Sequence, residues 1–181
     1  DLYEAELRDL VETSTDEVRR LDHIVDQFLK AIRPSKPQLE PTDINELIKE
    51  SMRFLEPEIK DRGLNLTLEL RSALPALELD PDQIKQAFYN IIKNSIQATP
   101  ESGKITVKTD LSDNHILVTF NDTGEGISAE NLSTVFQPYF TTKKSGTGLG
   151  LLIIRRIIRE HGGDIKISSE EGFGTSVCIS L

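Results

Sequence analysis

The sequence predicts an α+β fold, a two-layer sandwich in which a mixed or mostly antiparallel sheet carries helices on one face, preceded by a long N-terminal helix. Helical and strand patterns are segregated along the chain and do not alternate one by one, as they would in a βαβ protein. Strand patterns also come in adjacent pairs, 104–110 with 115–120 and 164–169 with 175–181, each joined by a short turn.

The N-terminal segment predicts a helix with one apolar seam. Its members recur at intervals of four and three residues, with one polar interruption: Leu7, Val11, Ser14, Val18, Leu21, Val25 and Phe28. Such a seam packs either on its own domain or in a bundle or dimer. We favour the bundle, because a single helix before an α/β domain has little else against which to bury the seam.

Three prolines in 33–41 end this helix and predict an interdomain linker. The sequence therefore divides into a helix over 1–33, a linker over 34–41 and a catalytic domain over 42–181. In that domain a helix begins after Thr42 or Asp43, and residues 64–70 alternate as a half-buried strand does.

Composition limits the function. The chain has 181 residues, 37% hydrophobic and 28% charged, which is typical of a soluble globular protein, and a cytoplasmic location is expected. A net charge of −9 disfavours nucleic-acid binding but allows a local basic pocket. The apolar runs are too short to span a bilayer, so membrane attachment is expected only through upstream segments. The single cysteine excludes an internal disulfide.

A helix predicted over 81–98 carries an unusual polar stripe. Asp80 is a good N-cap and Pro81 suits the first helical position. One face of this helix is predicted to enter the core and another to be rich in carboxamides: Ile84, Phe88, Ile91 and Ser95 against Gln83, Gln86, Asn90, Asn94 and Gln97. The stripe is either a solvated face or a ligand site. Asn is a poor helix former, and its carboxamide oxygen can ligate Mg²⁺.

The loop 121–128 follows a strand and contains Asp122, Gly124 and Gly126. It is either a tight turn or a binding loop. In a binding loop, Asp122 would accept a hydrogen bond from an exocyclic amine, and the glycines would let a flat ring approach the backbone.

Residues 135–144 place Phe136, Tyr139 and Phe140 in a segment without a clear period. These aromatic residues either fill the core or anchor a mobile flap. In the second case Thr142, Lys143 and Lys144 would form the polar tip of that flap.

Three glycines, Gly146, Gly148 and Gly150, precede an apolar helical run. The pattern is neither the Walker loop nor the dinucleotide fingerprint. It is either a flexible loop before a core helix or an anion site. Glycines allow successive N–H groups to converge, and the following helix adds its unpaired N–H groups and its dipole.

Four segments together resemble the catalytic, ATP-binding domain of sensor histidine kinases of two-component systems, in the superfamily shared with gyrase, Hsp90 and MutL. "NIIKNSIQA" resembles the N box, "NDTGEGI" and "GTGLGL" the two glycine boxes, and "FQPYFTTK" the F box. The resemblance covers residues 43–181. "EVRRLDHIVDQFLKAIRP" resembles the second helix of the dimerisation and histidine-phosphotransfer domain, and its ending is similar to nitrogen-regulation-type sensors.

The resemblance implies a site for ATP and Mg²⁺. Asn94 would hold the metal with Asn90 in support, Asp122 would bind the adenine amine with Thr175 near it through water, and Lys143 would reach the phosphates. The full set of implied nucleotide-binding residues is Asn90, Asn94, Gln97, Asp122, Gly124, Gly126, Ile127, Phe136, Thr142, Lys143, Gly146, Thr147, Gly148, Leu149, Gly150 and Thr175.

The implied activity is donation of the ATP γ-phosphoryl group to a histidine, for relay to an aspartate of a response regulator. A homodimer through the N-terminal helix is implied when the full bundle is present. Hydrolysing relatives carry a glutamate base where this chain has Asn90, and an amide cannot take a proton. The alternatives are an ATP-hydrolysing clamp of the same superfamily and a degenerate nucleotide-binding interaction module.

Two departures from the family pattern stand out. Gln97 occupies a position where many relatives carry a lysine. None of His23, His115 and His161 has the acidic residue and proline that follow the family's phosphoacceptor. The acceptor is therefore expected on a helix that precedes Asp1, and the chain alone is not expected to be a self-sufficient kinase.

Overall fold

The computed structural model describes residues 11, 14, 15, 18, 36–143 and 146–181 of the chain. Two compact units make up the chain, Asp1–Ser35 and Lys36–Leu181. In the first unit, Val11 and Val18 of the predicted seam are exposed, at 59% and 57%. Apart from Ser14, the other predicted seam residues lie outside the described residues.

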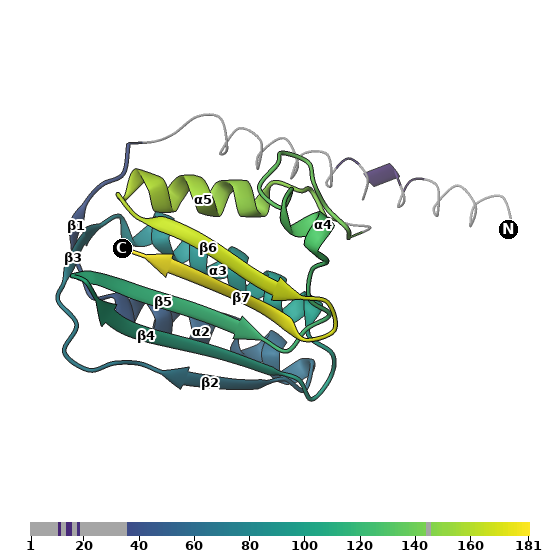
Figure 1. Cartoon of the computed structure of the whole chain (residues 1–181), viewed down its shortest axis with the longest axis horizontal. Helices are drawn as coiled ribbons and strands as arrows, with labels where there is room; N and C mark the ends of the chain where they lie inside the picture. Colours follow the sequence, from purple (N-terminus) through teal and green to yellow (C-terminus); the bar gives the residue numbers. More distant parts are fainter. Residues whose placement is uncertain (1–10, 12–13, 16–17, 19–35, 144–145) are drawn as a thin grey trace, which may run out of the picture. The chain divides into compact units, whose positions relative to one another are not determined.

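The second unit is a layer of helices on one face of a sheet (Figure 1). Its elements are β1 (Glu40–Thr42), α2 (Ile44–Asp61), β2 (Asn65–Glu69), β3 (Leu77–Leu79), α3 (Pro81–Ala98), β4 (Lys104–Ser112), β5 (His115–Asp122), α4 (Ala129–Leu132), α5 (Gly150–Glu160), β6 (Asp164–Glu170) and β7 (Gly174–Ser180). The main sheet has the order β2-β4-β5-β7-β6. Only its β2–β4 pair is parallel. The predicted α+β fold with a mixed sheet is confirmed.

A second, two-stranded sheet pairs β1 with β3 in antiparallel register, Glu40 opposite Leu79. This sheet was not predicted, since the three prolines indicated a linker over residues 34–41. The later part of that segment belongs to the second unit, because Glu40 and Pro41 lie in β1. A two-stranded sheet has only edge strands, where a proline without an N–H group is tolerated.

The core lies between α3 and the main sheet. The four residues predicted for the core face of α3, Ile84, Phe88, Ile91 and Ser95, are all buried. The ring of Phe88 packs on Phe120 of β5, with centroids 5.4 Å apart and planes at 54°. This packing fixes the position of α3 against the strand that ends at Asp122.

The N-terminus of α3 is joined to the C-terminus of α5. The Asp80 side chain caps α3 by accepting from the N–H groups of Asp82 and Gln83, and it also accepts from Gln38 N at 2.9 Å. The Asp80 N–H donates to His161 Nε2 at 3.0 Å. Because Nε2 is an acceptor, Nδ1 carries the proton of the neutral ring and donates to the Ile157 carbonyl at 2.7 Å.

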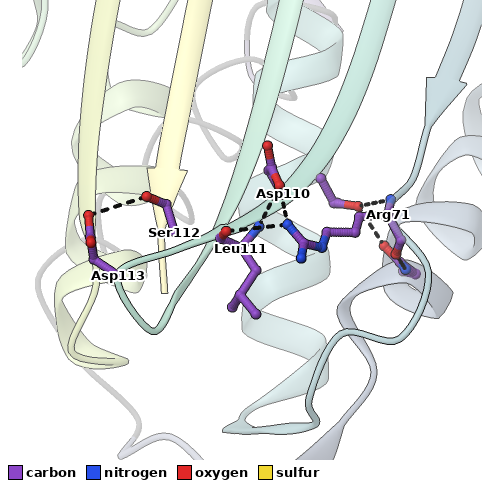
Figure 2. A network of polar contacts seen from close by, with 7 residues as sticks. Arg71, Asp110, Leu111, Ser112 and Asp113 are labelled. Carbon is purple, nitrogen blue, oxygen red and sulfur yellow. Dashed lines mark hydrogen bonds and ion pairs between the residues drawn. The ribbon is translucent and has the colours of Figure 1, made fainter.

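A polar network holds the end of β4 near the turn into β5 (Figure 2). Arg71 Nη1 donates to Asp110 Oδ1 at 2.7 Å, and the Arg71 N–H donates to the hydroxyl of Thr109. Asn45 at the start of α2 donates to the Arg71 carbonyl at 2.8 Å. The network therefore ties the segment after β2 both to β4 and to the first turn of α2.

Candidate functional site

Asp122, at the end of β5, is held by hydrogen bonds to both of its carboxylate oxygens. Oδ1 accepts from the N–H groups of Gly124, at 3.0 Å, and of Thr175, at 3.1 Å. Oδ2 accepts from the Ser95 hydroxyl on α3, at 2.9 Å. Each carboxylate oxygen has two acceptor positions. Among the described contacts, Oδ2 therefore keeps one position with which to accept from a ligand's N–H group.

Ser169 on β6 fixes the direction of the Thr175 hydroxyl. Ser169 Oγ donates its single proton to the Gly174 carbonyl at 2.8 Å and accepts from Ile127 N at 2.8 Å. Its contact with Thr175 Oγ1 is 2.9 Å long. The proton of Ser169 is already used, so Thr175 is the donor in that contact. The lone pairs of Thr175 thus remain available beside Asp122.

The loop after β5 approaches other backbone closely enough to require glycine. Gly126 has φ of +71°, and a Cβ there would collide with the carbonyl of Glu170. A Cβ on Gly124 would meet the Ala98 carbonyl at 2.8 Å. The loop therefore lies tightly between the end of α3 and the β6–β7 turn. The fold itself requires glycine at these two positions, whether or not a ligand binds.

The polar stripe of α3 meets a lysine from the segment before α5. Lys143 Nζ donates to Gln97 Oε1 at 2.8 Å and lies 3.5 Å from Asn94 Oδ1. Burial lowers the pKa of Lys143 below its ordinary value, and the charges of Glu125 and Asp122 act in the opposite direction. This half-buried ammonium therefore lies beside Asn94, the predicted metal ligand.

Asn90 presents a buried donor to the same stripe. Its Nδ2 atom is buried and has no hydrogen-bond partner within the described part of the chain. Leaving such a group unpaired costs about 1–3 kcal/mol. A ligand oxygen or a bound water would satisfy it.

The glycine loop begins α5 without a side-chain cap. Leu149 occupies the N-cap position and makes no side-chain capping bond, so the first N–H groups of the helix receive no side-chain acceptor there. Gly148 has φ of +67°, and a Cβ there would collide with the Tyr139 backbone. Tyr139 N donates to the Gly148 carbonyl at 3.1 Å. The aromatic segment and the glycine loop thus pack backbone to backbone.

Of the remaining predicted residues, Phe136, Thr147 and Leu149 have described contacts near the start of α5, whereas Thr142 has no described contact with the other candidates. Phe136 lies beneath Arg155 of α5, whose guanidinium carbon is 4.8 Å from the ring centroid, and so joins the segment to that helix. The N–H of Leu149 donates to Thr147 Oγ1 at 3.4 Å within the loop. Thr142 is exposed, and no described contact brings it to the other candidates.

A bound Mg²⁺ would depend on few protein ligands. In residues 36–143 and 146–181, no group of three or more His, Cys, Asp or Glu side chains is placed to hold a metal ion. The residues present fit a metal bound mainly through phosphates and water, as Mg²⁺ usually is. Asn94 Oδ1 already faces a cation, the Lys143 ammonium, and the Asn90 amide is a partner for a metal-bound water.

The comparisons with known proteins agree on one family. Residues 79–181 match the family model described as histidine kinase-, DNA gyrase B-, and HSP90-like ATPase. Sensor histidine kinase ZraS of Escherichia coli strain K12 is 34% identical over 176 residues, which cover 97% of this chain and 38% of ZraS. Sporulation kinase E of Bacillus subtilis strain 168 is 34% identical over 169 residues, 92% of this chain and 23% of that kinase.

Solved structures give the same result. The nucleotide-free catalytic domain of histidine kinase ThkA superposes with a TM-score of 0.72 at 33% identity, covering 79% of this chain and 94% of that chain. ThkA in complex with the response regulator protein TrrA gives a TM-score of 0.80 at 30% identity, covering 97% of this chain and 51% of that chain.

The chain belongs to the histidine kinase-, DNA gyrase B-, and HSP90-like ATPase family. Within that family it carries the catalytic domain of a sensor histidine kinase of a two-component system. It spans 38% and 23% of the lengths of the two curated kinases described above. Among the described residues, no helix combines the length and apolar character needed to cross a membrane.

Sequence reasoning missed Ser169 and the role of Ser95. Ser95 was placed on the core face of α3, and a serine within a row of isoleucines was the available signal. Ser169 had no such signal. Ser168 and Ser169 point to opposite faces of the sheet, and the sequence alone does not show which of the two faces the site. The contact between Lys143 and Gln97 was also missed, because it joins residues 46 positions apart.

Proposed function

We propose that the chain binds ATP with Mg²⁺ and donates the γ-phosphoryl group to a histidine on another helix. The observation that carries this proposal is the held carboxylate of Asp122. Three hydrogen bonds fix its position, and one acceptor position on Oδ2 remains for the exocyclic amine of adenine. Thr175 would support the same ring edge through a water.

The phosphates would lie between the start of α5 and the amide stripe of α3. The uncapped N–H groups of α5 and the Lys143 ammonium supply positive charge for them. Mg²⁺ would neutralise phosphate charge during transfer, with Asn94 as its protein ligand and Asn90 in support. ATP is an intracellular nucleotide, so this function places the domain in the cytoplasm.

Transfer to a protein fits this site better than hydrolysis does. Activating water requires a base, and the amide of Asn90, which the resemblance places where hydrolysing relatives carry a glutamate, cannot accept a proton. A degenerate interaction module is disfavoured by the held carboxylate and the uncapped helix start, which are both suited to a ligand.

The two described histidines are unsuited to accept the phosphoryl group. Both ring nitrogens of His161 are engaged, with Asp80 N and with the Ile157 carbonyl. His115 begins β5, whereas Asp122 ends it, which separates them by roughly 24 Å. His23 lies outside the described residues. We propose that the acceptor belongs to another helix, because no acidic residue directly follows His23, and that relay continues to an aspartate of a response regulator.

We further propose that the N-terminal segment assembles with that acceptor helix in a homodimeric bundle. Val11 and Val18 are exposed apolar residues at the spacing of a helical seam. A partner helix would cover them. A response-regulator partner is supported by ThkA, which has been solved in complex with the response regulator TrrA.

Labelling with γ-labelled ATP and Mg²⁺ tests this function. The chain alone should bind ATP without acquiring acid-labile phosphate. Labelling should appear when a protein that carries the acceptor helix of a sensor kinase is added. Val18→Asp should block this labelling and leave nucleotide affinity unchanged, because a charge on the seam would be buried unpaired. Thr13→Asp, which adds the same charge at a position off the predicted seam, is the matched control.

Other outcomes would contradict the proposal. Steady ATP turnover by the chain alone would favour the hydrolase. A lack of binding to any adenine nucleotide would favour the interaction module. Labelling of the isolated chain at His23 would show that the first helix carries its own acceptor.

A further inference from the structure

A lysine from one segment and a carboxamide from a distant helix form a direct pair at the end of α3. Lys143 Nζ donates to Gln97 Oε1 at 2.8 Å. The same ammonium lies 3.5 Å from Asn94 Oδ1, three residues earlier on the helix. Residues three apart lie on the same side of a helix, so the two amide oxygens converge on one cation.

The identity of residue 97 matters because of this pair. Position 97 carries a neutral acceptor in this chain. A carboxamide oxygen can accept from an ammonium, whereas an ammonium has no lone pair with which to accept. Lys143 therefore supplies the positive charge at this end of α3, and Gln97 accepts a hydrogen bond from its ammonium group.

We propose that Gln97 is a positioning residue: it holds the Lys143 ammonium beside Asn94, so that the two residues together supply one positive charge to the polyphosphate of a bound nucleotide. The inference rests on the proposed function and adds to it a role for Gln97 that does not require Gln97 to touch the nucleotide. It also explains how the site keeps a cation although position 97 carries none.

The surroundings favour a fixed ammonium at this place. Lys143 is half-buried, while Gln97 is exposed at the end of the helix. A partly desolvated charge interacts with a ligand more strongly than a freely solvated one. Fixing a lysine side chain costs conformational entropy. The contact with Gln97 already restricts Lys143 in the free protein, so less entropy is lost when the nucleotide binds.

The first experiment is a double-mutant cycle on nucleotide affinity, measured by calorimetry with ATP, with and without Mg²⁺. Lys143→Gln should weaken binding about tenfold, as expected for the loss of a charged contact. Gln97→Leu removes the acceptor and should weaken binding severalfold. In the Lys143→Gln background, Gln97→Leu should cost nothing further, because Gln97 acts through Lys143.

A charge swap supplies the rescue. Gln97→Lys combined with Lys143→Gln keeps one ammonium and one carboxamide at the same place with their origins exchanged. This variant should recover most of the affinity that Lys143→Gln loses. Lys85→Gln is the control, because it removes the same charge near the opposite end of α3, where Lys85 pairs with Asp82.

The second experiment needs no nucleotide. The pair ties the segment containing Tyr139 and Phe140 to α3, so Gln97→Leu should speed amide exchange at these two residues in the free protein, with no change at Phe88. If the parent chain fails to bind ATP, the proposed function is wrong, and this exchange measurement still tests the pair. The inference is overturned by additive losses in the cycle, by a swap no better than Lys143→Gln, or by unchanged exchange.

Discussion

The Ser95 hydroxyl donates a 2.9 Å hydrogen bond to Asp122 Oδ2, joining the buried face of α3 to the end of β5. This contact leaves the carboxylate oriented with one free acceptor position. It also places a side chain from the core helix in direct control of the group proposed to bind adenine.

Replacement of Asp122 by Asn should weaken ATP binding by about 1.5–3 kcal/mol, the value of a charge-assisted hydrogen bond. The amide can keep Oδ1 as acceptor for Gly124 and Thr175, but its NH₂ group would then face the adenine amine, donor against donor. Ser95→Ala should cost less, about 0.5–1.5 kcal/mol, because it removes one neutral donor. Calorimetry that gives equal ATP affinity for parent and Asp122→Asn would refute the assignment.

Alanine substitutions at Gly148 and at Gly150, the first residue of α5, should have different effects, one on stability and the other on ATP binding. Gly148→Ala should destabilise the fold by about 1–3 kcal/mol, since φ is +67° and the new Cβ would collide with Tyr139. An added Cβ on Gly150 would meet no described atom within 4 Å beyond its chain neighbours and its own helix backbone, so Gly150→Ala should leave thermal stability unchanged or slightly raised. It should nevertheless weaken ATP binding, because the methyl group would lie where the phosphates approach. Unchanged affinity for Gly150→Ala would argue against a phosphate at this loop.

The two phenylalanines on α2 and α3 should differ sharply in their contribution to stability. Phe88 is fully buried against Phe120, so Phe88→Ala should cost about 3–5 kcal/mol of unfolding free energy. Phe54 is 73% exposed and packs its ring near Tyr89, with centroids 5.9 Å apart, so Phe54→Ala should change stability by about 0.5 kcal/mol or less. Urea denaturation of both variants measures the contrast, and similar losses would mean that the core does not lie between α3 and the sheet.

The cap of α3 should contribute to the acid sensitivity of the fold. Burial raises the pKa of Asp80, but hydrogen bonds from the N–H groups of Gln38, Gln83 and Asp82 lower it more, below its ordinary 3.8. A carboxyl with a lowered folded pKa stabilises the fold above its unfolded pKa. That stability is lost as pH falls through the folded pKa.

The stability difference between the parent and Asp80→Asn should therefore be constant above about pH 5 and shrink as the pH falls below it. Asparagine also caps helices well, so the variant should still fold. Denaturation of both proteins from pH 7 to pH 3 gives the comparison, with Asp164→Asn, at an exposed strand position, as control. A difference that grows with acidity would have the wrong sign for this interpretation.

Sequence periodicity was enough to predict most of this fold. Alternation identified β2, and paired strand patterns joined by turns identified β4 with β5 and β6 with β7. The start of α2 was predicted after Thr42 or Asp43, of which Asp43 is the observed cap, and Asp80 marked the start of α3. The strands β1 and β3 have three residues each, which is too short for a period, and Pro41 argued against a strand. The helix α4 has only four residues and was missed for the same reason.

The candidate site could be predicted by residue type but not by contact. Asn94, Asp122 and the loop glycines stood out because their chemistry or flexibility is unusual where they occur. The pairing of Lys143 with Gln97 could not be predicted, because the segment that carries Lys143 has no periodicity that would show where it packs against α3. Hydrogen-bond partners between distant residues are set by tertiary packing, which a single sequence does not display.

The helix α5 runs without interruption from Gly150 at the glycine loop to Glu160, a length of about 16 Å, and its next residue, His161, holds the Asp80 N–H. Asp80 in turn receives the N–H of Gln38, close to where the chain enters this unit. Thermodynamic linkage between the two ends is reciprocal. If a ligand at the loop shifts α5 and so changes the free energy of the Gln38 contact, strain applied at Gln38 changes the affinity for that ligand by an equal factor.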